Sequence, residues 1–134
     1  MAVPPERMWH RWSELFNGGD VDGAIEETVH PDIEWIPITV EGTVFHGHAG
    51  VRLWIEQHFG FWETFELYPE EVLPAGPERV LVLGHWHARG RGSGLGFERR
   101  PAAWLLDFRD GKVVRMETFT EIPAAMEAAG LEPG

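Results

Sequence analysis

Residues 97–120 read FERRPAAWLLDFRDGKVVRMETFT, and this stretch decides the fold. Asp110 and Gly111 lie between two runs that are rich in apolar and β-branched residues. The Asp-Gly pair suits a two-residue β-hairpin, because both central residues of that turn adopt a positive φ. We therefore predict antiparallel strands over residues 97–109 and 112–120.

Further strands are predicted on the N-terminal side of this hairpin, in runs bounded by turn-forming residues. They cover residues 65–73 and 79–91, with a strand at 33–38 and a short partner for it at 44–45. Because the connections between the later strands are short, we expect them to pair antiparallel.

Three helices are predicted before most of these strands. Residues 5–17 carry apolar side chains at helical spacing and end at Gly18-Gly19, and Asp20 is placed to cap a second helix that ends before Pro31. From Ala49 onward comes the strongest helical stripe: Val51, Trp54, Ile55, His58, Phe59 and Trp62. A last helical turn is predicted at 123–129, with Gly130 as its stop. This order predicts an α+β fold in which three N-terminal helices pack on one face of a curved, mostly antiparallel sheet and leave a concavity.

Composition limits the functions open to the chain. Its 134 residues suffice for one domain, and 43% hydrophobic residues rule out disorder. Eleven Lys and Arg against 22 Asp and Glu give a net charge of −11, which disfavours nucleic acid and anionic membranes as partners. There is no cysteine, no basic leader and no run of about 20 apolar residues, so we expect a cytoplasmic location and no membrane segment.

Four short motifs, in this order and spacing, resemble the SnoaL-like group of the nuclear transport factor 2-like cone fold. They are Phe16-Asn17-Gly18-Gly19-Asp20-Val21-Asp22-Gly23, Pro31-Asp32-Ile33-Glu34-Trp35, Gly47-His48-Ala49-Gly50-Val51, and Phe108-Arg109-Asp110-Gly111-Lys112-Val113-Val114-Arg115. The resemblance implies a single SnoaL-like domain over residues 1–134, with a pocket between sheet and helices and frequent dimerisation through the outer sheet face. It implies no particular reaction, since one fold hosts many.

The acids of the related enzymes are absent at the matching positions. Alignment with the ketosteroid isomerase pattern places Trp12, Trp35 and Trp104 where that pattern has a tyrosine and two aspartates. An indole has one N–H donor and no proton that titrates near neutrality, so it cannot act as the base. The epoxide hydrolase pattern places Gly84, Trp86 and Thr118 at its arginine and aspartates, and the polyketide cyclase acid also falls near Thr118.

These substitutions favour a small-molecule-binding protein with an aromatic-lined apolar pocket. We predict that its ligand-binding residues are Trp12, Trp35, Trp54, Trp86, Trp104 and Thr118. His58, inside the apolar stripe of the third helix, is the candidate catalytic acid or base. Two alternatives stay open: a lyase, isomerase or polyketide-cyclase-type enzyme that uses other acids such as Glu34 or Glu117, and a non-catalytic dimerisation module whose cone is filled by tryptophans.

Histidine pairs raise the question of a metal. His46 with His48 and His85 with His87 are two apart, which puts each pair on one face of a strand. Because no carboxylate stands at a completing spacing, we predict no metal centre, and we expect no cofactor. His85, His87 and Arg89 should face away from the pocket beside Leu81 and Leu83, forming an exposed, partly apolar surface that predicts a homodimer.

Overall fold

The computed structural model describes residues 4–38, 43–92 and 95–131. The elements within these residues are, in chain order, α1 (Pro5–Asn17), α2 (Val21–Thr28), β1 (Val29–Ile36), β2 (Phe45–His46), α3 (Gly47–Phe61), β3 (Trp62–Gly76), β4 (Arg79–Gly90), β5 (Gly96–Arg109), β6 (Lys112–Phe119) and α4 (Ile122–Ala128). The α+β fold predicted from the sequence is confirmed. No helix among the described residues is both long enough and apolar enough to cross a membrane.

One curved sheet holds the strands in the order β2-β1-β6-β5-β4-β3. Only the β1–β6 pair is parallel among the strand pairs of the described residues. The β5–β6 hairpin is confirmed: Arg109 pairs with Lys112, and Asp110 and Gly111 have φ of 54° and 77°. The decisive sequence stretch therefore forms the centre of the sheet.

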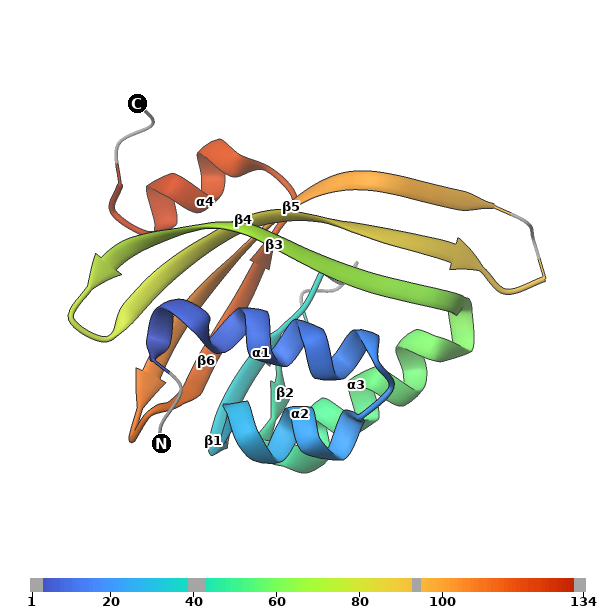
Figure 1. Ribbon diagram of the computed structural model, residues 1–134, viewed down its shortest axis with the longest axis horizontal. Helices are drawn as coiled ribbons and strands as arrows, with labels where there is room; N and C mark the ends of the chain where they lie inside the picture. The colour runs from blue at the N-terminus through green and yellow to red at the C-terminus, as the bar shows by residue number, and fades with distance from the viewer. Residues whose placement is uncertain (1–3, 39–42, 93–94, 132–134) are drawn as a thin grey trace.

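Helices cover both faces of the sheet, as Figure 1 shows. α1, α2 and α3 lie on the concave face, and α4 lies on the opposite face. Beneath α4, the side chains of Leu81 and Ala103 are fully buried and pack with Ala125. The prediction that Leu81 is exposed on the outer face was therefore wrong, because the last helical turn folds back over that part of the sheet.

Proline positions shift two predicted boundaries. Pro31 does not stop α2; the helix ends at Thr28, and Pro31 lies in β1 where the register to β6 is irregular between Val29 and Glu34. β3 extends past the predicted residues 65–73 at both ends, with Pro69 and Pro74 at register shifts. As an edge strand, β3 tolerates residues that lack an N–H donor.

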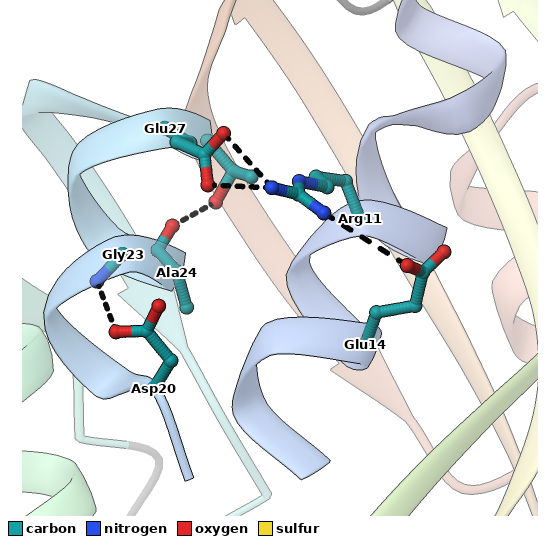
Figure 2. A network of polar contacts seen from close by, with 7 residues as sticks. Arg11, Glu14, Asp20, Gly23, Ala24 and Glu27 are labelled. Carbon is teal, nitrogen blue, oxygen red and sulfur yellow. Dashed lines mark hydrogen bonds and ion pairs between the residues drawn. The ribbon is translucent and has the colours of Figure 1, made fainter. Parts of the chain in front are cut away.

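Side-chain hydrogen bonds fix the helices that bound the concave face. Figure 2 shows Asp20 accepting from the Gly23 N–H at 2.9 Å, which confirms the predicted cap, and Arg11 of α1 binding Glu27 of α2 at 3.0 Å. Asn17, the last residue of α1, bonds both backbone groups of Leu67 in β3, its Nδ2 donating at 2.8 Å and its Oδ1 accepting at 3.0 Å. These bonds join α1 to α2 on one side and to β3 on the other.

Candidate functional site

A cavity of about 230 Å³ lies between the concave face of the sheet and the helices. The described residues that line it come from α1, α3, the strands and the segment after β1: Trp9, Trp35, Pro37, Ile38, Trp54, His58, Trp62, Phe65, Leu67, Trp86, Ala102, Trp104, Met116 and Thr118. They include six of the seven tryptophans and no Asp, Glu, Lys or Arg. The cone is therefore hollow, contrary to the alternative of a cone filled by tryptophans.

Strand alternation places the sheet's side chains in this cavity. Trp86 of β4 and Trp104 of β5 both face inward, while His85 and His87 face outward. Gly84 allows the strands to approach here, since a Cβ at this position would collide with the Tyr68 carbonyl oxygen and lie 3.1 Å from the Trp104 ring. A glycine is therefore required at position 84 by the close approach of the Tyr68 backbone and the Trp104 ring.

The cavity has a deep end and an open end. Trp9, Trp35 and Trp104 are at most 2% exposed, and the Trp9 ring centroid lies 5.9 Å from that of Trp35 and 5.6 Å from that of Trp104. Trp54 and Trp86, by contrast, are only half-buried. Ile38, which also belongs to the lining, is 49% exposed, so the cavity reaches the surface beside Ile38 as well as beside Trp54 and Trp86.

His58 is the titratable group of the lining, and its surroundings are aromatic. Its ring centroid lies 4.1 Å from Phe65, 4.8 Å from Trp54 and 6.3 Å from Trp62. Burial lowers the pKa of His58 from 6.5 to about 4. The imidazole is therefore neutral at pH 7, and its Nε2 has no hydrogen-bond partner within the described part of the chain.

Few polar groups face a ligand in this cavity. The indole N–H groups of Trp9 and Trp35 are buried among protein atoms and have no partner among the described residues. The Thr118 hydroxyl donates to the Met116 thioether at 3.1 Å, a weak acceptor. The cavity therefore suits an apolar body with at most a few polar contacts.

The structure brings together most of the predicted site residues. Trp35, Trp54, His58, Trp86, Trp104 and Thr118 all line the cavity. Trp12 does not: it is fully buried behind the lining, with its ring centroid 5.8 Å from Trp9 and 4.9 Å from Trp35. One turn of α1 separates Trp9 from Trp12, and Trp9 is the residue that reaches the cavity wall.

The acids considered for an enzyme lie outside the cavity lining. Glu34 is exposed and alternates with inward-facing Trp35. Glu117 bonds Arg115 at 3.2 Å and alternates with Met116 and Thr118. Neither carboxylate is placed to act on a molecule in the cavity.

Sequence reasoning missed two of the lining tryptophans. Trp9 lies three residues before Trp12 on the same helix face, so the i, i+3 pattern was available as a signal. Trp62 was assigned to the end of the third helix but is the first residue of β3, where a register shift between Trp62 and Thr64 disturbs the strand alternation. For the remaining apolar lining residues, the sequence holds no pattern that predicts a place in the cavity apart from the alternation of side chains along a strand.

The histidine pairs have structural contacts. His48 donates from Nε2 to the Val29 carbonyl at 2.7 Å and joins α3 to β1. His85 donates from Nδ1 to Glu70 at 2.6 Å, and this hydrogen bond holds the pKa of the Glu70 carboxyl below its usual value. A carboxylate does therefore reach His85, contrary to our reading of the spacing. Across residues 4–38, 43–92 and 95–131, no three His, Asp or Glu side chains are grouped to hold a metal ion.

Comparison with known proteins agrees with this architecture. The family model of the SnoaL-like domain matches residues 9–116, and the chain therefore belongs to the SnoaL-like family. No curated protein matches the sequence.

Solved structures share the fold at low sequence identity. The structure of TerC co-crystallised with polyporic acid is 24% identical, covers 96% of this chain and 99% of its own, and has a TM-score of 0.78. A SnoaL-like polyketide cyclase-type protein from Jannaschia sp. CCS1 is 22% identical, with coverage of 96% and 93% and a TM-score of 0.73. A protein of ketosteroid isomerase-like fold from Catenulispora acidiphila, in complex with trimethylamine, is 15% identical, with coverage of 97% and 96% and a TM-score of 0.74. The nuclear transport factor 2-like fold inferred from the sequence is thus confirmed.

Proposed function

We propose that this protein binds an apolar aromatic small molecule in the cavity between sheet and helices. The observation that carries the proposal is the lining: six indoles around about 230 Å³, with no formally charged side chain at pH 7. Aromatic rings gain from stacked or edge-to-face contact with other rings, and an ionic ligand would lose its hydration here without a partner.

The size of the cavity narrows the ligand. Drug-sized sites usually enclose about 300–1,000 Å³, so this cavity fits a bicyclic ring system better than a large polycycle. The structural relatives support small-molecule binding by this fold, since TerC was crystallised with polyporic acid and the Catenulispora protein with trimethylamine.

A cavity-filling substitution tests the proposal. Thermal shift and calorimetry with 1-methoxynaphthalene should show binding to the wild-type protein. Ala102→Leu adds volume to the lining at a fully buried position and should abolish that binding. Ala128→Leu, at an exposed position on α4, is the matched control and should bind normally. Binding by Ala102→Leu at wild-type affinity would place the ligand elsewhere.

A second candidate function is proton transfer at a carbon next to a carbonyl, of the kind that isomerases and cyclases use. The observation that favours it is the position of His58, whose neutral imidazole lines the cavity. With Glu34 and Glu117 outside, His58 is the residue that would act as the base.

The homodimer is retained as part of the proposal. Tyr68, His85 and His87 form a ring cluster on the outer face of β3 and β4, with centroid distances of 4.7–5.1 Å. All three are partly exposed, His85 with 12% of its side chain accessible, which leaves a ring-rich surface on the outer face of the sheet. A surface of this kind suits a second copy of the chain.

A further inference from the structure

A second hollow lies next to the cavity on the surface of the protein. It is an open groove of about 360 Å³ beside the end of β6 and the start of α4. The groove and the cavity share three lining residues, Pro37, Ile38 and Thr118. The two spaces therefore adjoin each other at these three residues.

We propose that the groove is a second subsite for the same ligand. In this arrangement a flat aromatic head occupies the cavity, an oxygen lies beside Thr118, and a short chain ending in an ammonium group follows the groove to Glu121. This inference rests on the proposed function of the cavity, because the tail is bound only when the head is.

Thr118 is suited to the junction between the two subsites. Thr118 belongs to the lining of both spaces, and its hydroxyl donates to the thioether of Met116. A thioether accepts hydrogen bonds weakly, so the hydroxyl can turn to an ether or carbonyl oxygen of a ligand at small cost.

Glu121 gives the groove its preference for a cation. It is the one charged residue in the two linings, as far as the described residues go, and it is exposed and makes no capping hydrogen bond to α4. The net charge of −11 adds a long-range attraction for cations. A ligand tail with a carboxylate would meet repulsion from both.

The distance from Thr118 to Glu121 limits the tail. Three residues of chain span at most about 10 Å, and a glutamate side chain is long enough to cover part of that distance. A tail of three or four atoms beyond the junction oxygen therefore suffices.

Three compounds that share one head test the inference. 1-Methoxynaphthalene is the head alone, 3-(1-naphthyloxy)propan-1-amine adds the ammonium tail, and 4-(1-naphthyloxy)butanoic acid adds a carboxylate tail. Calorimetry on the wild-type protein should give the amine at least about tenfold higher affinity than the head, and the acid no gain. Glu121→Gln should reduce the gain of the amine about threefold and leave the affinity for the head unchanged.

Two variants separate the groove from general effects. Ala124→Trp fills the groove and should remove the gain of the amine, while unchanged affinity for the head shows that the variant is folded. Glu127→Gln, also exposed on α4, removes the same charge away from the groove and should have no effect. Three results would overturn the second subsite and leave the cavity proposal standing. They are equal affinities for the head and the amine, a higher affinity for the amine that persists in Ala124→Trp, and a loss of amine affinity in Glu127→Gln equal to that in Glu121→Gln. Failure of the head itself to bind would reject the proposed function, and the subsite with it.

Discussion

His58 illustrates how one residue's surroundings set its chemistry. The ring is enclosed by Trp54, Trp62 and Phe65, and this burial lowers its pKa to about 4. Above that pH the imidazole is unprotonated and able to accept a proton, although a pKa this low also makes it a weak base. Any reaction that depends on His58 must therefore have a pH dependence unlike that of an exposed histidine.

We expect His58 to accelerate hydrogen–deuterium exchange at the carbon next to the carbonyl of 1-indanone, as followed by NMR. The rate should rise as pH increases through about 4 and level off above about pH 5–6, because the fraction of neutral imidazole is then complete. His58→Gln should remove the acceleration at every pH. Two results would eliminate His58 as the base: equal exchange rates in the wild-type protein and in His58→Gln, or a pH profile of the rate with its midpoint near pH 6.5.

Which residues line the cavity could be predicted where the period of a strand or helix is regular, as for Trp54 and His58 on α3. Trp86 and Trp104 were placed on the cavity side correctly because the pairing of β4 with β5 is regular from Arg79 to Trp86, and its register shift comes only after Trp86. On α1 the pattern was ambiguous, since Trp9 and Trp12 are both buried and only the packing against Trp35 decides which of them lines the cavity.

At the scale of the elements, Asn17 joins the end of α1 to the edge strand β3. On the free edge of β3, its side-chain amide takes the place that the backbone of another strand would have. It donates one hydrogen bond to the Leu67 carbonyl and accepts one from the Leu67 N–H. Leu67 lines the cavity, so the same contact holds one wall of the site.

Asn17→Leu keeps the approximate volume but removes both hydrogen bonds. The N–H and carbonyl of Leu67 are then left unpaired in a partly buried place, and we expect the free energy of unfolding to fall by about 2 kcal/mol in urea denaturation. Asn17→Asp retains the acceptor but sets a carboxylate oxygen against the Leu67 carbonyl, so it should also lose stability. Glu14→Ala, on the exposed face of the same helix, should change stability by under about 0.5 kcal/mol. If Asn17→Leu lowers the free energy of unfolding no more than Glu14→Ala does, the hydrogen bonds between Asn17 and Leu67 do not stabilise the fold.

Element types followed from local chemistry, whereas several boundaries depended on tertiary pairing. The Asp110-Gly111 turn needs no long-range contact to form, and it was placed correctly. Pro31 was predicted to end the second helix because proline lacks an N–H donor. In the structure Pro31 lies in β1, where the register between β1 and β6 is irregular, so the missing donor is tolerated there. The placement of α4 over Leu81 could not be predicted, since it depends on how the end of the chain turns back across the sheet.

For the whole molecule, the two faces of the sheet have different tasks. The concave face holds the cavity, and the convex face is divided between α4 and the ring cluster of Tyr68, His85 and His87. Because α4 already buries the apolar residues Leu81 and Leu105, a second copy would pack mainly against the ring cluster.

This division leads to a prediction about the assembly. At micromolar concentration, light scattering should give twice the chain mass of 15.2 kDa. Tyr68→Glu places a charge in the centre of the ring cluster and should give the monomer mass, because two buried carboxylates would face each other across a two-fold interface. Leu53→Glu adds the same charge at a residue of α3 that is 46% exposed, on the other side of the sheet, and should remain dimeric. A wild-type protein that is monomeric, or a Leu53→Glu variant that dissociates as Tyr68→Glu does, would show that the outer face of β3 and β4 is not the interface.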